Sequence, residues 1–577
     1  MPKRALLQRQ TCHSQSLQLM ACAAAESSWL RGARNVDVHL LRAATAPPLL
    51  SFAQTRRQQQ QQQQQSRSRQ RDTQQQPKEQ QEEPLPAYRV EHSELYGRYL
   101  VANRALAAGE QLIREQPLAI GPCVSCEPVC LGCYQPVRLG PAQCRCEGCG
   151  WPLCAADCRG LRQSSGHSRE ECELYGRRRA QAAELLNESA SPDAVRDLYE
   201  LVLIVRILLM RQHRPEEYAR IRLMESHTEQ RRENLTLWQH YEKKVVQRLL
   251  HDWQLAQELG GLEPAEVHEI CGILDVNCFE IGQRGGKART LYPSAFLLAH
   301  DCRPNTSHTD DPLDYSIILR TSRSVREQET LTLSYAYTLQ GTLKRRTFIQ
   351  GGKLFWCQCQ RCADPRELGS DCSDLVCKIC RTGSIRATEP LNQEADWACD
   401  RCAHRIESAQ VERLLDHIND DLESIDVHDI PALENFLIRY REVLRPNHYL
   451  LLSAKYSLCQ IYGRVEGYLL PQLSPRDIER KERYCREFLA VIDILEPGLT
   501  RLRGLIMYEL HAPIMVLAQL GMQSGRMSRQ EFQRRIKEVV RLLKESAHIL
   551  QLEPPGSSEH EMGLAAADAL AKINAQL

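Results

Sequence analysis

The sequence has almost no net charge and no long apolar run, and each absence excludes a class of function. Lysine and arginine number 74 against 73 acids in 577 residues, so no global basic surface for nucleic acid is present, although a local basic patch stays open. The most apolar stretch, residues 198–210, contains Glu200 and Arg206 and is too short to cross a bilayer. We expect a buried helix there, no contact with a membrane and no direct nucleic-acid binding.

The first 86 residues lack the composition of a folded domain. They include an unbroken glutamine tract at 58–65, flanked by further Gln, Arg and Ser, and sequence of such low complexity cannot bury a core. The first fifty residues contain only two acids, Glu26 and Asp37, which is also typical of a mitochondrial transit peptide. We favour a disordered tail over residues 1–86, with a transit peptide as the alternative.

Cysteine, by contrast, is abundant and has the spacing of zinc ligands. Many of the 25 cysteines stand in Cys-x-x-Cys or Cys-x-Cys spacings near histidine. This favours metal sites over disulfides and a reducing compartment, the nucleus, the cytoplasm or both. The first cysteine block offers eight soft ligands, enough for two closed structural zinc sites, with Cys123 and Cys126 as competing ligands. The eight are Cys130, Cys133, Cys146, Cys149, Cys154, Cys158, His167 and Cys172.

A second cysteine region predicts two more closed zinc sites. The triad Cys357-x-Cys359-x2-Cys362 needs a fourth soft ligand. Cys302 is the obvious donor. A further set, with the separation of a zinc ribbon, consists of Cys377, Cys380, Cys399 and Cys402. Since neither set leaves a position open for water, we expect structural zinc and no hydrolytic metal chemistry.

Periodicity separates strands from helices along the chain. Residues 99–102 and 111–120, on either side of a turn at Gly109, predict a hairpin of short strands, and strand patterns return at 315–319 and 330–335.

Helical periodicity dominates two long regions. Apolar residues recur at three- and four-residue intervals from 175 to about 274 and again from 406 to the end. No clean repeat period marks the second region, so an irregular bundle and tandem helix pairs of the tetratricopeptide kind both stay open.

Several motifs occur in the order of a split SET domain. They are Gly97-Arg-Tyr-Leu, Asn277-Cys-Phe, Ala299-His-Asp-Cys-Arg-Pro-Asn, Ser334-Tyr and the triad that ends at Cys362. The first cysteine block resembles a MYND zinc finger inserted after the first strands. From residue 88 to 577 the chain therefore resembles a SET and MYND domain-containing protein. The extra ribbon at 377–402 is similar to the arthropod-type, SmydA-like branch of that family.

The resemblance implies an α+β multidomain fold, in which a split, β-rich SET domain carries an inserted MYND finger and a helical insert. A post-SET zinc site and a C-terminal all-α domain similar to tetratricopeptide repeats follow. The implied boundaries are 1–86 tail, 87–122 first SET part, 123–172 MYND finger, 173–270 helical insert, 271–340 SET core, 341–405 post-SET and ribbon, and 406–577 helical domain. The resemblance also implies interleaved ligation, with Cys130, Cys133, Cys154 and Cys158 around one zinc and Cys146, Cys149, His167 and Cys172 around the other.

The activity implied by the resemblance is methyl transfer from S-adenosyl-L-methionine to a protein lysine, histone or not. Alignment in a narrow channel supplies much of the catalysis of such an in-line displacement. Tyr335 is the candidate catalytic residue, because its hydroxyl can orient the amine and stabilise charge near the sulfonium. The candidate cofactor-binding residues are Gly97, Arg98, Tyr99, Asn277, His300, Asn305, Tyr335 and Phe355. The MYND finger implies proline-rich peptide partners, and we expect a monomer that regulates gene expression at chromatin.

The sequence departs from the family pattern within this candidate site. Ala299 stands where an asparagine usually holds the cofactor, Asp301 replaces a serine, and Tyr99 replaces the second glycine of a turn. Lys353 stands where many active members have a tyrosine that lines the lysine channel. Loss of a buried amide contact costs about 1–3 kcal/mol. A working methyltransferase is our first hypothesis; the second is a weak or inactive SET protein that acts as an interaction scaffold or transcriptional corepressor.

Overall fold

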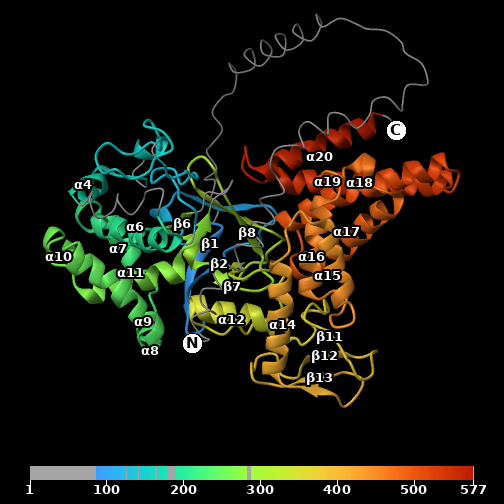
Figure 1. The fold of residues 1–577 in the computed structure, drawn as a ribbon, viewed down its shortest axis with the longest axis horizontal. Coiled ribbons are helices and arrows are strands. Elements are labelled where there is room, and N and C mark those ends of the chain that lie inside the picture. Colours follow the sequence, from blue (N-terminus) through green and yellow to red (C-terminus); the bar gives the residue numbers. More distant parts are fainter. Residues whose placement is uncertain are drawn as a thin grey trace, which may run out of the picture. The chain divides into compact units, whose positions relative to one another are not determined.

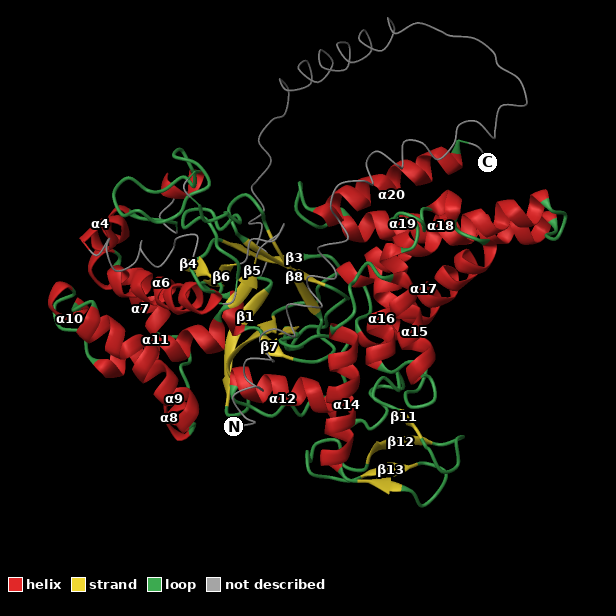
Figure 2. Cartoon of the chain, viewed as in Figure 1, coloured by secondary structure: helices red, strands yellow, loops and turns green. Residues whose placement is uncertain are grey.

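Short strands and many helices alternate along the described part of the chain (Figures 1 and 2). The computed structural model describes residues 86–577 without 125, 141, 163–165, 178–189, 282–287 and 576–577. The predicted tail, with its glutamine tract, lies outside these residues except for Pro86. The strands of the first part are β1 (Tyr88–Ser93), β2 (Gly97–Ala102), β3 (Gln111–Glu115), β4 (Ala119–Pro122), β5 (Phe279–Ile281), β6 (Ala288–Leu291), β7 (Ala299–His300), β8 (Thr306–Asp310), β9 (Ile317–Thr321) and β10 (Thr332–Leu333).

Strand pairing differs from the sequence prediction at one place. β1 pairs with β2 across a tight turn that ends at Gly97, whose φ of +62° suits glycine. β3 pairs with β9 instead of β2, so the hairpin predicted between 99–102 and 111–120 is wrong. Local periodicity identifies strands, but it cannot identify a partner that lies beyond a long insertion.

The strands form small sheets that bring distant segments together. One sheet has the order β3-β9-β8 and another β4-β6-β5, while β10 and β7 form a parallel pair. That pair aligns Ala299 with Thr332 and His300 with Leu333. The two segments predicted to build the site therefore lie side by side, over a buried core that includes Leu100, Tyr292 and Leu331.

A helical layer covers the sheet that contains β4. The helices are η2 (Arg159–Arg162), α4 (Arg169–Arg177), α6 (Pro192–His213), α7 (Pro215–Arg222), α8 (Thr228–Glu233), α9 (Leu235–Tyr241), η3 (Glu242–Val246), η4 (Arg248–Asp252), α10 (Leu255–Glu258) and α11 (Pro264–Asn277). α6 contains the predicted buried helix of 198–210, which is confirmed, because every residue from 198 to 210 in it is buried. Ser191 caps it, its hydroxyl accepting from the N–H of Ala194, and Pro192 occupies the first turn.

The short turn η5 lies between β6 and β7. After β10 the chain continues with α12, α13 and a small sheet, and then with helices. The elements are η5 (Ala295–Leu297), α12 (Thr342–Lys353), α13 (Gln360–Ala363), β11 (Leu375–Val376), β12 (Ser384–Ala387), β13 (Trp397–Cys399), β14 (Arg405–Ile406), α14 (Ser408–Glu423), α15 (Ile430–Tyr440), α16 (Tyr449–Ile461), η6 (Leu470–Gln472), α17 (Pro475–Leu495), α18 (Arg501–Gln523), α19 (Arg529–Leu550) and α20 (Ser558–Asn574). The strands β11 to β14 are antiparallel neighbours in sequence order, and consecutive helices from α15 to α20 pack on one another.

One helix qualifies our expectation about apolar runs. Among the described residues, α18 is long and apolar enough to cross a membrane by length and composition. The expectation that no apolar run is long enough to cross a bilayer therefore does not hold for α18. α18 packs between α17 and α19, and half of its most apolar window is buried there. Packing against neighbouring helices accounts for its composition without a bilayer.

Leu203→Ala should destabilise the core under the sheet. Leu203 is fully buried in the core beneath β4, and truncation to alanine removes its Cγ and both Cδ atoms, so a cavity forms where these atoms packed. We expect a loss of about 2–5 kcal/mol in the free energy of unfolding. Urea unfolding followed by tryptophan fluorescence measures it, since Trp151 and Trp253 belong to the same core. The matched control is Leu235→Ala at a position 67% exposed; an equal loss there would contradict the packing argument.

Candidate functional site

Four groups of soft ligands converge in the described residues. The members of each group offer ligand atoms that all lie within 4.8 Å of one another. The groups are Cys130, Cys133, Cys154 and Cys158; Cys146, Cys149, His167 and Cys172; Cys302, Cys357, Cys359 and Cys362; and Cys377, Cys380, Cys399 and Cys402. We call them tetrads 1 to 4 in that order. All sixteen predicted ligands are thus brought together in the expected sets, whereas Cys123 and Cys126 belong to none.

The size of the tetrads suits zinc. Several sulfur–sulfur distances within them lie between 3.5 Å, as for Cys133–Cys154, and 3.9 Å, as for Cys302–Cys357. A tetrahedral zinc ion with Zn–S bonds of about 2.3 Å requires sulfur edges of about 3.8 Å. In tetrad 2 the Cys149 Sγ lies 3.3 Å from Nε2 of His167, the one nitrogen in the sixteen ligands. Each tetrad can therefore hold a metal ion with a closed shell.

A buried carboxylate contacts the histidine ligand of tetrad 2. Nδ1 of His167 lies 2.9 Å from Glu171 on α4, whose side chain is 1% exposed. This contact directs the other ring nitrogen, Nε2, towards the metal position, as carboxylates that hydrogen-bond to a ligating histidine do in zinc proteins. Burial would raise the pKa of Glu171, but Arg206 and His167 outweigh burial and lower it.

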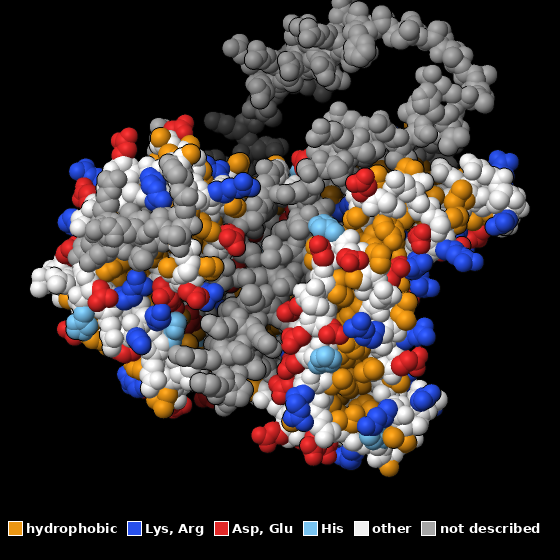
Figure 3. Space-filling view, viewed as in Figure 1, with side chains coloured by type: hydrophobic (Ala, Val, Ile, Leu, Met, Phe, Trp, Pro, Cys, Tyr) orange, Lys and Arg blue, Asp and Glu red, His pale blue; other side chains and the backbone are white. Residues whose placement is uncertain are grey.

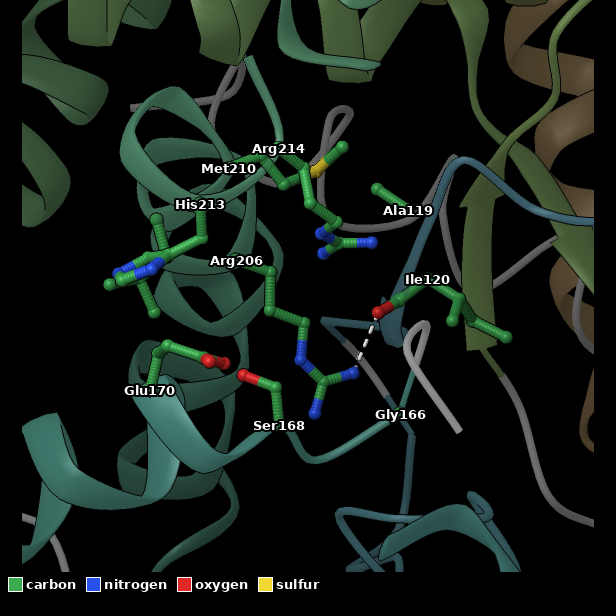
Figure 4. Close-up of a pocket in the computed structure, with 10 residues that line it drawn as sticks. Ala119, Ile120, Gly166, Ser168, Glu170, Arg206, Met210, His213 and Arg214 are labelled. Atoms are coloured by element: carbon green, nitrogen blue, oxygen red, sulfur yellow. Dashed lines mark hydrogen bonds between the residues drawn. The ribbon is translucent and has the colours of Figure 1, made fainter. Parts of the chain in front are cut away.

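Arg206 links tetrad 2 to the helical layer. Its Nε and one terminal nitrogen each donate to Glu171 at 3.0 Å, and its other N–H groups donate to carbonyls of Ile120 at 2.7 Å and Leu131 at 3.1 Å. Figure 4 shows Arg206 reaching from α6 towards Ile120 beside a cavity lined by Ser168. The charged residue within the apolar run of α6 thus connects β4, α4 and the cysteine-rich segment 123–172 that contains tetrads 1 and 2, which we call the zinc module.

A second buried ion network supports tetrad 3. Glu367, 1% exposed, accepts from Arg345 at 2.6 Å and from Nε of Arg361 at 3.1 Å. The same arginines reach the tetrad, with Arg345 3.6 Å from Cys362 Sγ and Arg361 3.5 Å from the Cys302 carbonyl. Two cations against one carboxylate leave a net positive charge that balances the thiolates. Burial would raise the pKa of Glu367, yet the arginines lower it to about 2.

Asn305 fastens the crossing of the parallel pair. Its Nδ2 donates to the Thr330 carbonyl at 2.8 Å, and its Oδ1 accepts from the N–H of Thr332 at 2.8 Å. Nδ2 also donates to Glu329 at 3.2 Å. Because both amide donors are used within the protein, the structure gives this predicted cofactor residue a positioning role at β10.

His300, Tyr335 and Phe355 form an aromatic cluster beside tetrad 3. The N–H of Tyr335 donates to Nδ1 of His300 at 2.9 Å, and the Tyr335 hydroxyl donates to the carbonyl of Leu298. The ring centroids of His300 lie 5.0 Å from Tyr335 and 6.0 Å from Phe355, and Nε2 of His300 lies 3.3 Å from Cys302 Sγ. Burial raises the pKa of Tyr335 above its ordinary value, so the phenol stays protonated near neutral pH.

The β1–β2 turn lies close to this cluster. Asp301 and the tetrad 3 thiols act on Tyr96 at its tip, and these charges, after burial, raise the pKa of that phenol. At Gly97 no heavy atom lies within 4 Å of the place where a Cβ would stand. The guanidinium of Arg98 lies 5.6 Å from the ring of Phe296, and the Tyr99 hydroxyl donates to Glu91 at 3.3 Å. The open space at Gly97 leaves room for a ligand against its backbone.

Asn277 is the last residue of α11. Its Nδ2 donates to the carbonyls of Glu225 and Ile273, both at 2.8 Å, so its amide nitrogen ties α11 to the loop before α8. Ala299, which replaces the usual asparagine, is buried in β7 and has no polar side-chain atom to offer.

Lys353 is the unexpected member of the site. It ends α12, and its Nζ lies 5.7 Å from the ring centroid of Tyr335. Nζ donates to the Val276 carbonyl at 2.5 Å and the Asp275 carbonyl at 3.4 Å. The chain's own amine thus stands next to the candidate catalytic tyrosine.

The buried charged residues that hold tetrads 2 and 3 were not predicted from the sequence. Glu171, in the first turn of α4, stands four residues after His167, and Arg206 is an isolated charge in an apolar run. Both signals were visible. The Arg345, Arg361 and Glu367 network carries no such pattern, because only packing around tetrad 3 brings its members together.

The outer surface shows no field of one sign on the face drawn in Figure 3, where Lys and Arg are interspersed with Asp and Glu. Many of these charges pair locally, such as Arg486 with Glu538 at 2.6 Å and Arg439 with Asp421 at 3.0 Å. This agrees with the near-zero net charge and offers no broad surface for nucleic acid on that face.

Comparison with known proteins adds relatives over most of the chain. No protein-family model matches it. It is 28% identical to the SET domain-containing protein SmydA-8, isoform B, of Drosophila melanogaster over 445 residues, 74% of this chain and 91% of the relative. It is 22% identical to the histone-lysine N-methyltransferase ASHR1 of Arabidopsis thaliana over 439 residues, 71% of this chain and 83% of that one. It is 28% identical to the histone-lysine N-methyltransferase SMYD3 of Mus musculus over 280 residues, 46% of this chain and 59% of that one.

Glu171→Gln should weaken metal binding at tetrad 2. The substitution keeps the size of the side chain but removes the charge that orients His167 and balances Arg206. We expect affinity for zinc to fall about 10- to 100-fold, measured by chelator competition on full-length protein. Glu173→Gln is the matched control, since Glu173 pairs with Arg169 on the surface. Equal losses in both variants would contradict the role of Glu171 in orienting His167.

Glu367→Gln should destabilise the region around tetrad 3 by about 3–5 kcal/mol, because two buried arginines lose their counter-charge. The folded pKa of about 2 lies below the ordinary value of about 4.3. The stabilisation is therefore fully present above about pH 4.3 and is lost as pH falls towards the folded pKa. Urea unfolding of parent and variant at a series of pH values measures the difference, which should shrink on acidification. Asp416→Asn, which breaks the more exposed pair with Lys344, should cost less than about 1 kcal/mol.

Proposed function

Because this chain belongs to the SET and MYND domain-containing family, in its arthropod SmydA-like branch, we propose that it is an S-adenosylmethionine-dependent protein-lysine N-methyltransferase. Among its relatives, one is named as a SET domain-containing protein and two are named as histone-lysine N-methyltransferases. The proposal concerns the activity of this chain itself.

The observation that carries the proposal is the cluster at the crossing of β7 and β10. His300, Tyr335 and Phe355 meet there, between tetrad 3 and the open turn at Gly97. Phe355 keeps 38% of its surface exposed, an aromatic face suited to an adenine ring. The backbone around Gly97 and His300 can hold the remainder of the cofactor. These residues fit S-adenosylmethionine, which supplies an activated methyl group on a sulfonium.

Tyr335 is the residue we assign to the acceptor amine. Its ring is fixed by the N–H contact to His300 and the hydroxyl contact to Leu298, so little reorganisation is needed when a lysine enters. Because the hydroxyl proton is donated to Leu298, the hydroxyl oxygen can accept an N–H of the amine and so direct the amine lone pair towards the methyl group.

The tetrads complete the proposal as four structural zinc sites. Tetrad 3 ties Cys302, two residues after His300, to the segment behind Phe355, so zinc there would hold both walls of the cofactor site. Tetrads 1 and 2 would order the MYND finger, for which we propose proline-rich peptide partners and a role in regulating gene expression in the nucleus or cytoplasm.

A second candidate function is favoured by one observation. The amine of Lys353 already stands over Tyr335, and Ala299 offers no amide to the cofactor. A chain with a filled channel and weak cofactor binding would act as a scaffold or corepressor through its zinc finger and C-terminal helices.

Calorimetry with S-adenosylmethionine separates the two. On the enzyme hypothesis the full-length, zinc-loaded chain binds the cofactor, Tyr335→Phe keeps binding, and Ala299→Asn tightens it up to about 100-fold by restoring an amide contact. A chain that binds only after Ala299→Asn would instead support the scaffold. Thermal denaturation and zinc content of each variant serve as folding controls.

A further inference from the structure

Lys353 is placed unlike an ordinary lysine at the end of a helix. The carbonyls of Asp275 and Val276 to which it donates belong to the last turn of α11, where backbone acceptors have no partner within the helix. The matched residue on the same helix, Lys344, pairs with Asp416 at 2.5 Å on a more exposed side. Lys353 is thus held by backbone dipoles, and among the described residues no carboxylate forms an ion pair with it.

The contacts of Lys353 also position its amine. An ammonium has three N–H directions, of which two are directed to the carbonyls of α11, and the ring centroid of Tyr335 lies 5.7 Å from Nζ. The lysine stands two residues before Phe355 in sequence, so it shares a segment with the candidate adenine wall. Burial lowers the pKa of Lys353, which favours the neutral, nucleophilic amine.

We propose that Lys353 is itself a methyl acceptor, so that the chain methylates its own Lys353 in cis. The inference rests on the proposed function, because it requires S-adenosylmethionine as methyl donor. It extends that function by naming an acceptor that is already held beside Tyr335 and needs no diffusional encounter.

The chemistry balances with the donor as co-reactant. Lys353 first releases one proton from its ammonium to water. The Nζ lone pair then attacks the methyl carbon in line, and the new C–N bond forms as the S–C bond breaks. The sulfur keeps the bonding pair and leaves as the thioether of S-adenosylhomocysteine, while the methylated Lys353 carries the positive charge. The first methyl group takes the third position on Nζ, so two N–H groups remain for the two carbonyls of α11, and only a second methyl group would remove one of these contacts.

Peptide mass spectrometry tests the inference. Full-length, zinc-loaded protein is incubated with S-adenosylmethionine carrying a deuterated methyl group and then digested. We expect label on the Lys353 peptide at a rate per molecule that is independent of protein concentration, and none on the Lys344 peptide. Lys353→Arg should lose the label, and Tyr335→Phe should slow it about 100-fold. Label only on other lysines would overturn the inference.

Two further readings separate this inference from the proposed function. Calorimetry on the same sample reports cofactor binding: binding without label on Lys353 overturns the inference alone, whereas absence of binding overturns both. The second reading needs no cofactor. With selectively 13C-labelled lysine, the side-chain protons of Lys353, assigned through Lys353→Arg, should shift upfield from the ring current of Tyr335. Tyr335→Leu should abolish this shift, and a solvent-like position in the parent would refute the placement.

Discussion

The candidate site depends on the convergence of four thiols, Cys302 with the triad that ends at Cys362. This tetrad joins the turn after β7 to the segment after α12, and those two segments carry His300 and Phe355. Four thiolates around a divalent ion leave an excess of negative charge, which would be costly in a buried place. Arg345 and Arg361 supply the compensating charge and Glu367 sets their orientation. The metal position, the ion network and the aromatic cluster are therefore one structural unit.

The zinc module uses the same principle in a different place. His167 needs a fixed ring orientation, Glu171 supplies it, and Arg206 makes the buried carboxylate tolerable while bonding to carbonyls of β4 and the zinc module. The charge inside the otherwise apolar α6 is thus explained by the metal site that packs on it. Loss of metal from tetrad 2 would also weaken the packing of β4, because Arg206 donates to carbonyls of both β4 and the zinc module.

The departures from the family pattern form a consistent local arrangement. Ala299 offers no amide at the proposed cofactor site, and Lys353 places a cation where the family resemblance implies a tyrosine, yet neither leaves a buried polar atom without a partner. Lys353 satisfies carbonyls of α11, and Asn305 satisfies the backbone of β10. The polar groups of these residues have partners within the protein, which favours the proposed acceptor over a decayed pocket.

The sequence by itself determined what depends on short-range spacing. The cysteine pairs, the buried helix at 198–210 and the motif order around Tyr335 could all be seen in the chain, because ligand spacing and helical periodicity are local properties. The tertiary structure decided what depends on distant partners. β3 pairs with β9 instead of β2, Arg345 and Arg361 meet Glu367, and the Lys353 amine reaches Tyr335 and the end of α11. No local pattern encodes these contacts, since they arise only when segments separated by long insertions pack together and bury their charges.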